Sequence, residues 1–154
     1  MNNNDFLAVH TTLCRFFAAF DKRDWASMID CLADEVFVDY SSSGREAPTK
    51  MKGEAFVSRR KMAIDNLSKQ HSFSNLFVQR DPDKSALTAS CNYLILRFDL
   101  SNADQHTNFF HSCGQYEFEM VSIEKGCKIS SIRQFKLQSW GDEKLHGGLS
   151  ATSD

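Results

Sequence analysis

The sequence lacks a long apolar run, a paired cysteine motif and an excess of charge of either sign, and each absence excludes a class of protein. No stretch approaches the roughly 20 apolar residues that span a bilayer, and the N-terminal MNNNDFLAVH has neither the charged leader nor the apolar run of a signal peptide. Five widely spaced cysteines without a CxxC pair predict reduced thiols. We therefore expect a cytoplasmic protein without a membrane partner.

Basic charge is not concentrated in the way that nucleic-acid binding requires. The formal net charge is −2, and lysines and arginines are scattered along the chain, so we expect no nucleic-acid partner. The densest basic cluster is SRRK, Ser58–Lys61, on a predicted helix. It indicates a solvated helix face or, alternatively, an anion contact.

Motifs that bind metals or cofactors are also missing. The sequence contains no glycine-rich phosphate loop, no HExxH and no GxSxG. His106 and His111 lie in or beside a polar loop and lack a third ligand at helical or strand spacing. We predict no metal and no cofactor.

Phenylalanine, by contrast, is abundant. Thirteen phenylalanines in 154 residues suit either a core of large rings or a cavity lined by them. The length fits one domain with one sizeable core. From Gly141 onward there are few apolar residues and no period, so we predict a single domain over 1–140 and a flexible tail over 141–154.

The first half of the chain has the period of helices. One apolar helical face with three-to-four spacing consists of Phe6, Val9, Leu13, Phe16, Phe17 and Phe20. Asp24 is placed to cap a second helix that carries Trp25, and residues 36–41, VFVDYS, predict a short strand. A third helix is expected to start near Gly53.

The second half changes to the period of strands. Runs at 71–80, 86–100, 109–123 and 127–140 are separated by turns or a polar loop, which predicts an antiparallel meander. Helices followed by strands indicate an α+β domain with helices packed on one sheet face. Tyr116 and Phe118 should point toward the helices. Arg133 lies in an apolar row of the last strand, where it is paired internally, faces a cavity or lies at a subunit contact.

The order of these segments resembles the SnoaL-like branch of the nuclear transport factor 2-like superfamily, which includes scytalone dehydratase, bile-acid dehydratase and polyketide cyclases. The resemblance runs from about Leu7 to Trp140 and rests on FDKRDW, on LADEVFVDY and on His71 at the start of a strand. It implies a cone-shaped, cystatin-like roll in which N-terminal helices pack in a curved antiparallel sheet beside a deep apolar pocket. It also implies a homodimer paired through the outer sheet face.

Within this group, the resemblance to scytalone dehydratase covers three polar positions. Asp21, Tyr40 and His71 fall where that enzyme has an aspartate, a pocket tyrosine and a histidine. A second tyrosine, a second histidine and a serine–asparagine pair are changed, at Phe20, near Leu96 or Arg97, and near Gly114 and Tyr116. The same dehydration of the same substrate is therefore not expected.

Each matching residue also has a purely structural interpretation. Asp21 lies at a helix C-terminus, where the macrodipole disfavours a carboxylate, so it is either solvated or paired inside. His71 is either a satisfied core or edge residue or a general acid/base with an ordinary pKa of about 6.5, oriented by Asp21. Tyr40 should point inward, toward a structural hydrogen bond or a ligand, and Asp39 toward the rim or surface.

Three functions are compatible with these residues. In a cofactor-free lyase or isomerase of dehydratase or cyclase type, His71 would remove a proton next to a carbonyl of a small apolar ring compound, Tyr40 would polarise the oxygen and Asp21 would orient His71. The predicted substrate-binding residues are Phe17, Phe20, Trp25, Phe73, Tyr116, Phe118 and Arg133. The alternatives are a noncatalytic module for a small apolar molecule and a dimerisation module with a filled pocket. A cavity of roughly 300 Å³ or more favours a ligand.

Overall fold

A computed structural model describes residues 3–45, 47–63 and 65–146 of the chain. The helices are α1 (Asn3–Lys22), α2 (Trp25–Asp30) and α3 (Gly53–Met62), with short 3-10 turns η1 (Ser41–Ser43) and η2 (Glu143–His146). The strands are β1 (Leu32–Asp39), β2 (Thr49–Lys52), β3 (Ser68–Arg80), β4 (Ala86–Phe98), β5 (Phe110–Ile123) and β6 (Gly126–Gly141). The predicted α+β class is confirmed.

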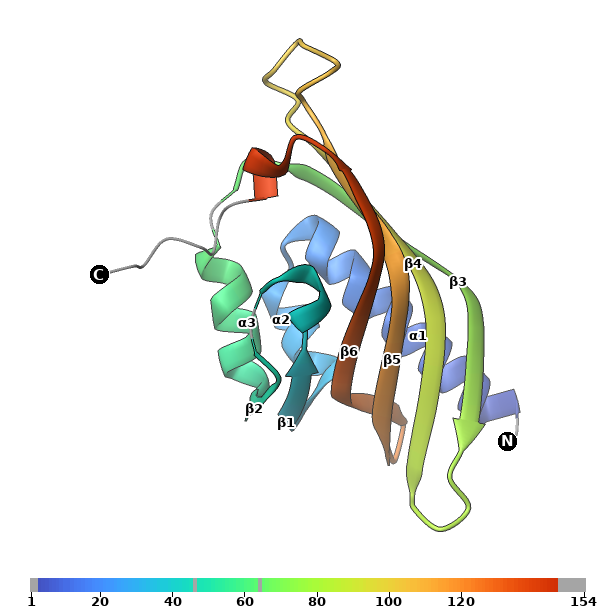
Figure 1. Cartoon of the computed structure of the whole chain (residues 1–154). Helices are drawn as coiled ribbons and strands as arrows, with labels where there is room; N and C mark the ends of the chain where they lie inside the picture. The colour runs from blue at the N-terminus through green and yellow to red at the C-terminus, as the bar shows by residue number, and fades with distance from the viewer. Residues whose placement is uncertain (1–2, 46, 64, 147–154) are drawn as a thin grey trace.

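The six strands form one curved sheet in the order β2-β1-β6-β5-β4-β3. The pairs β3–β4, β4–β5 and β5–β6 form the predicted antiparallel meander, whereas β1 pairs with β6 in parallel and β2 is an additional short strand. Figure 1 shows the long strands curving around α1, with α2 and α3 beyond β1. This curvature brings side chains from both ends of the sheet to one interior.

The helices form where the apolar spacing predicted them. Val9, Leu13, Phe16 and Phe17 are all buried on one face of α1, and the Phe17 ring lies 6.3 Å from that of Phe118 on β5. Asp24 caps α2, because its carboxylate accepts a hydrogen bond from the Ser27 backbone N–H at 3.1 Å. These contacts fix α1 against the concave face of the sheet.

Two irregularities change which side chains face the interior. In β3 the pairing with β4 shifts between Ser74 and Phe77, next to Asn75 with φ of 53°, so Phe77 is exposed rather than inward. In β6 the pairing with β5 shifts by one residue just after Ile129. A β-bulge of this kind puts two residues opposite one and reverses the alternation beyond it.

The predicted contact of Arg133 with a substrate in the cavity is therefore wrong, whereas its alternative position at a subunit contact stays a prediction. Beyond the bulge, Ile132 and Gln134 are buried, whereas Arg133 and Phe135 are exposed on the outer face of the sheet. The guanidinium of Arg133 lies 5.1 Å from the ring of Phe37. Arg133 is not a residue of the interior cavity.

The C-terminal segment is structured further than predicted. The tail was expected from Gly141, but β6 includes Gly141, and η2 extends the described chain to His146. The remainder of the predicted tail, 147–154, lies outside the described residues. Within the described ranges, no helix is long and apolar enough to cross a membrane.

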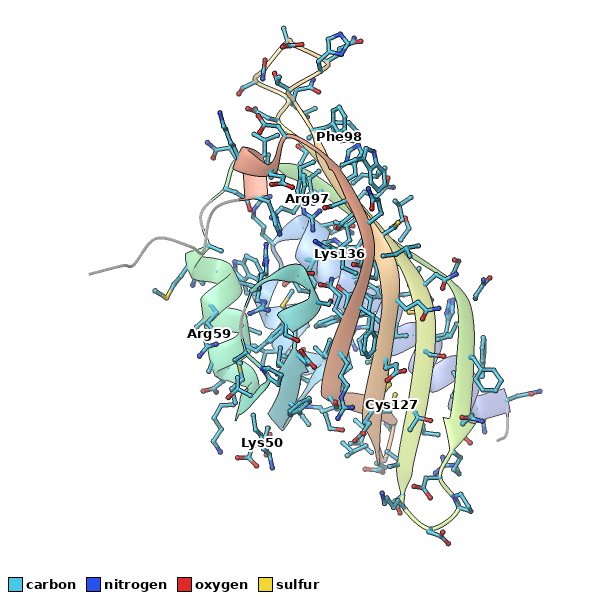
Figure 2. The ribbon with its side chains drawn as sticks, in the orientation of Figure 1. Lys50, Arg59, Arg97, Phe98, Cys127 and Lys136 are labelled. Atoms are coloured by element: carbon cyan, nitrogen blue, oxygen red, sulfur yellow. The ribbon has the colours of Figure 1, made fainter. Side chains whose placement is uncertain are left out.

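Side chains differ along the length of the sheet. Figure 2 shows Arg97 and Lys136 toward the end where η2 and the 99–109 loop lie, whereas Cys127 and Lys50 lie toward the opposite end. The apolar core occupies the space between α1 and the middle of the sheet. The end of the sheet near η2, called the polar end below, carries Arg97 and Lys136, and a cavity lies there.

Candidate functional site

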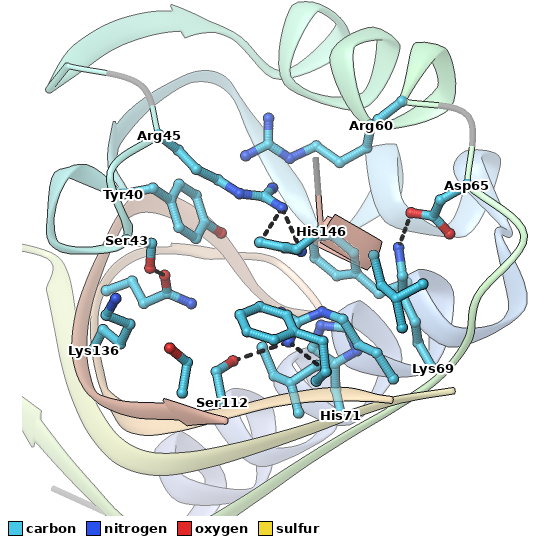
Figure 3. Close-up of a pocket in the computed structure, with 18 of the residues that line it drawn as sticks. Tyr40, Ser43, Arg45, Arg60, Asp65, Lys69, His71, Ser112, Lys136 and His146 are labelled. Carbon is cyan, nitrogen blue, oxygen red and sulfur yellow. Dashed lines mark hydrogen bonds and ion pairs between the residues drawn. The ribbon is translucent and has the colours of Figure 1, made fainter. Parts of the chain in front are cut away.

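A cavity of about 310 Å³ lies at this polar end, between the sheet, α1, α3 and η2 (Figure 3). Its aromatic and aliphatic wall includes Phe20, Trp25, Tyr40, Ile95, Phe110, Tyr116 and Leu145. The rest of its wall is polar. Apolar and polar side chains therefore both line this cavity, whereas an apolar pocket was predicted.

His71 and Asp21 form a hydrogen-bonded pair at the cavity wall. The Asp21 carboxylate accepts from the His71 backbone N–H with both oxygens at 3.0 Å and from Nδ1 of the ring at 2.6 Å. Because a carboxylate only accepts, Nδ1 carries the proton. The other ring nitrogen, Nε2, has no hydrogen-bond partner among the described residues, and the ring lines the cavity.

The local structure explains why the two residues meet. Phe17, Phe20 and Asp21 lie at positions i, i+3 and i+4 of α1 and so share one helical face. The imidazole of His71 stacks against Phe20 at 5.0 Å and against Phe17 at 5.8 Å. These rings hold the imidazole in one orientation, and Asp21 fixes its tautomer.

Burial keeps His71 neutral at pH 7. Desolvation lowers the pKa of His71, the hydrogen bond and charge of Asp21 raise it, and the positive charges of Arg97 and Lys69 lower it again. The net pKa lies below the ordinary value of 6.5. A neutral imidazole with a proton on Nδ1 presents the Nε2 lone pair to the cavity as a base.

Tyr40 lies on a different side of the cavity from His71 (Figure 3). Burial raises the pKa of Tyr40, an effect opposed by the charges of Arg60 and Arg45 and by hydrogen bonds with Tyr116 and Arg60. The phenol therefore keeps its proton at neutral pH and can donate it. Asp39 accepts hydrogen bonds from the backbone N–H and the hydroxyl of Ser41 and does not line the cavity.

A chain of hydrogen bonds continues from the tyrosines to the turn η1. The Gln134 amide donates to the Tyr116 hydroxyl at 2.8 Å, and the Ser43 hydroxyl donates to Gln134 Oε1 at 2.5 Å. Burial raises the pKa of Tyr116 well above 10. Two neutral phenols thus form one wall, opposite a neutral imidazole.

Apart from Arg133 on the outer sheet face, the predicted residues divide into three groups. Phe20, Trp25, Tyr40, His71 and Tyr116 line the cavity, and Asp21 lies directly behind His71. Phe17, Phe73 and Phe118 belong to the packing behind the wall, so their predicted contact with a ligand is wrong. Tyr40 directly follows β1 and His71 lies on β3, so the two come from near opposite ends of the sheet.

Sequence reasoning missed the basic side chains of the cavity. Seven lysines and arginines line it, namely Arg23, Arg45, Arg60, Lys61, Lys69, Arg97 and Lys136. Asp65 is the one carboxylate among the described residues of the lining. Of the two interpretations of SRRK, the anion contact is the one that the positions of Arg60 and Lys61 favour.

Asp65 is already neutralised by two of these cations. Its carboxylate accepts from Lys69 Nζ at 2.5 Å and from Arg23 Nη2 at 3.1 Å, and Arg23 also donates to the Leu67 carbonyl at 2.8 Å. Burial raises the pKa of Asp65, but the hydrogen bond and charge of Lys69, the hydrogen bond from the Leu67 backbone and the charge of Arg23 together lower it below its ordinary value. These bonds anchor the 65–67 segment at the cavity mouth.

His146 of η2 completes the wall. Its Nε2 lies 2.5 Å from the Arg45 guanidinium. Burial and the positive charges of Arg45, Arg97 and Lys69 lower the pKa of His146 to about 3. His146 is therefore neutral at pH 7 and accepts a hydrogen bond from Arg45.

The lining contains no evident metal site. In residues 3–45, 47–63 and 65–146, no group of three or more His, Cys, Asp or Glu side chains is placed to hold a metal ion. The chemical groups available are a neutral imidazole, protonated phenols, serine hydroxyls and several cations. This set can transfer a proton and bind an anion.

Comparison with known proteins identifies the family. The search of curated proteins finds no significant match. Solved structures share the fold at low identity: the Kfla4162 protein from Kribbella flavida has a TM-score of 0.80 at 14% identity, with 94% of this chain and 96% of that chain covered.

Two further structures agree with this likeness. A candidate scytalone dehydratase from Novosphingobium aromaticivorans has a TM-score of 0.71 at 10% identity, with 88% of this chain and 85% of that chain covered. A cystatin-like protein from Nostoc punctiforme has a TM-score of 0.67 at 14% identity, with 89% and 94% covered. The SnoaL-like domain profile matches residues 3–133, and the chain therefore belongs to the SnoaL-like domain family within the nuclear transport factor 2-like fold.

Proposed function

We propose that this domain is a cofactor-free lyase or isomerase in which His71 transfers a proton on a small ring compound held in the cavity. The observation that carries the proposal is the 2.6 Å hydrogen bond from His71 Nδ1 to Asp21, which leaves Nε2 free at the cavity wall. A base held in one tautomer by a carboxylate is the usual arrangement for general acid/base catalysis.

The residues suggest a simple sequence of events. Nε2 of His71 removes a proton from the carbon next to a carbonyl of the ring compound, and Asp21 stabilises the imidazolium that forms. The Tyr40 phenol, kept protonated by its raised pKa, donates a hydrogen bond to the oxygen that gains charge. The imidazolium then returns the proton, either to another carbon or to a departing hydroxyl, which leaves as water.

The relatives support a reaction of this class without identifying it. One similar structure is a candidate scytalone dehydratase, and it shares the fold at 10% identity. Phe20 and Arg97 lie at or near the positions where the resemblance to scytalone dehydratase would place a tyrosine and a histidine. We therefore propose the proton transfer rather than the substrate of that enzyme.

The test is hydrogen–deuterium exchange on a panel of ring ketones in D₂O, followed by NMR. The wild-type protein should accelerate exchange at the carbon next to the carbonyl, and His71→Asn should reduce the acceleration by about a hundredfold or more. His106→Asn, in the exposed loop, is the matched control and should leave the rate unchanged. Equal rates for wild type and His71→Asn would exclude His71 as the base.

A noncatalytic binding protein is the second candidate. The basic lining favours it, because seven cations can hold an anion without any chemistry. In that case the wild-type protein accelerates no exchange, and His71→Asn binds the same compounds as the wild type does. The third candidate, a dimerisation module with a filled pocket, is disfavoured by a cavity of about 310 Å³.

A further inference from the structure

Arg97 is the most unusual side chain in the cavity. The residue is only 7% exposed, and its Nη1 donates to the Ser112 hydroxyl at 3.1 Å and to the Phe110 carbonyl at 3.4 Å. Both acceptors are neutral. No carboxylate of the described residues forms an ion pair with Arg97, although a buried cation is normally compensated by one.

Neighbouring positive charges make the burial of the Arg97 cation still less favourable. Lys69 lies directly opposite Arg97 in the pairing of β3 with β4, and like charges opposite each other destabilise a sheet. Asp65 compensates Lys69 at 2.5 Å. Burial and the charge of Arg45 lower the pKa of Arg97 to about 10, so the guanidinium is still a cation at neutral pH.

The position of Arg97 relates it to the proposed base. Ile95 lies opposite His71 in the same pairing, and Arg97 is two residues further along the same face of β4. Such diagonal neighbours lie roughly 7–8 Å apart. A ring compound whose anionic group contacts Arg97 can therefore extend toward Nε2 of His71.

The elements that carry these cations favour a carboxylate over a phosphate. A planar guanidinium binds either anion through two parallel hydrogen bonds, so the guanidinium itself does not discriminate between them. Many phosphate sites use backbone amides at helix N-termini or in glycine-rich loops, whereas Arg97 and Lys69 lie on strands.

We infer that the ligand of this cavity is a small ring compound with a carboxylate, and that Arg97 binds the carboxylate so that the ring lies against His71. This inference rests on the proposed function for the role of His71, and it names the substrate class. Arg97 acts here as a specificity-determining residue. The apolar ligand expected from sequence is replaced by one with a negatively charged end.

Calorimetry with benzoate, its neutral isostere benzamide and inorganic phosphate tests the inference. Wild-type protein should bind benzoate about tenfold or more tightly than benzamide, and phosphate at the same concentration should not displace benzoate. Arg97→Met should abolish this preference, because it should weaken the binding of benzoate far more than that of benzamide. The matched control Arg133→Met, on the outer sheet face, should retain the preference.

Arg97→Lys is a second variant that can test the inference if Arg97→Met does not fold. It keeps the charge and loses the planar fork, so the preference for benzoate should fall several-fold in a folded protein. Equal binding of benzoate and benzamide, no binding of benzoate at millimolar concentration, displacement by phosphate, or a preference that survives both substitutions would overturn the inference.

Failure of this inference and failure of the proposed function are distinguishable. His71→Asn should keep the benzoate preference and lose the exchange activity. If the preference depends on Arg97 but exchange is independent of His71, the carboxylate site stands and the catalytic role is excluded. If exchange depends on His71 but the preference does not depend on Arg97, the catalytic role stands and the carboxylate site is excluded.

Discussion

At the scale of single residues, the chemistry depends on which nitrogen of His71 carries the proton. Asp21 accepts from Nδ1 at 2.6 Å and from the His71 backbone at 3.0 Å, so the carboxylate fixes both the ring and the strand on which it sits. Phe17 and Phe20 stack against the imidazole at 5.8 and 5.0 Å. The imidazole is held as a neutral base by neighbours contributed by a single helix face.

Asp21→Asn should reverse this tautomer. In this variant the backbone N–H of His71 would donate to the side-chain carbonyl oxygen at position 21. The side-chain NH₂ group would then donate to Nδ1 of His71, so the ring proton would be on Nε2. Exchange activity should fall by about a hundredfold, and the pKa of His71 should fall further because the carboxylate that raises it is gone. Nitrogen-15 NMR of the ring reports both changes. An unchanged tautomer in the variant would refute this role of Asp21.

At the scale of elements, bulges and close approaches decide which side chains reach the cavity. Gly114 on β5 is one such place: a Cβ there would lie 2.1 Å from the Phe135 carbonyl oxygen and 2.9 Å from a ring carbon of Tyr93. The pairing of β5 with β6 is also irregular between Cys113 and Gly114. β5 and β6 can approach each other closely at this point because Gly114 has no side chain.

Gly114→Ala should therefore destabilise the protein by roughly 3 kcal/mol, since backbone atoms must move to admit the methyl group. Urea unfolding gives the free energy of unfolding. Gly44→Ala is the control: Gly44 has φ of 68° and no atom within 4 Å of an added Cβ, so only left-handed strain of about 1 kcal/mol is expected. Similar losses for both variants would contradict this explanation.

The 3-10 turn η2 should make stability depend on pH. The folded pKa of His146 is about 3, below its ordinary value of 6.5, so the unfolded chain binds a proton that the folded chain does not between these values. The free energy of unfolding should fall as the pH drops from 6.5 toward 3. Burial lowers this pKa most, the charges of Arg45, Arg97 and Lys69 lower it further, and the charge of Asp65 raises it.

His146→Gln should reduce this pH dependence, because it removes one of the titrating groups; His71 and His111, whose pKa values are also lowered, still contribute to the slope. Urea unfolding at a series of pH values measures the slope for wild type, His146→Gln and the loop control His106→Gln. The control should keep the wild-type slope. The same slope in all three proteins would show that η2 does not bury His146 in solution.

At the scale of the whole molecule, the sequence predicted the fold well because the fold depends on local periods. The three-to-four spacing of apolar residues predicted α1, their alternation with polar residues predicted the meander, and Asp24 predicted the start of α2. Of the two alternatives for Asp21, solvation or an internal partner, the structure has the internal partner, with the His71 ring at 2.6 Å. The parallel pairing of β1 with β6 has no local signal, because it joins segments far apart in the chain.

The charge of the cavity could be predicted only in part. Arg133 was selected because it interrupts an apolar row, yet the bulge after Ile129 turns it outward. Arg97 ends an equally apolar row on β4, after Tyr93 and Ile95, and no bulge intervenes. The same rule applied to β4 would have found it. The other cations come from separate segments and meet only in three dimensions.

The outer face of the sheet should mediate dimerisation, as the resemblance implies. Phe135 and Leu137 on β6 are 45% and 79% exposed, next to the similarly exposed Trp140. Burying these side chains would favour association. Analytical ultracentrifugation should find a dimer for the wild type and a monomer for Leu137→Lys, with Lys125→Ala in the β5–β6 turn as control. A monomeric wild-type protein would contradict the proposal.

The central claim is that Arg97 and His71 hold one anionic ring compound between them, and a crystal structure of the wild-type protein with benzoate tests it most directly. We predict the carboxylate within about 2.7–3.2 Å of the Arg97 guanidinium, with the ring inside the cavity and facing Nε2 of His71. A benzoate bound away from Arg97, or a ring directed out of the cavity and away from His71, would contradict the account.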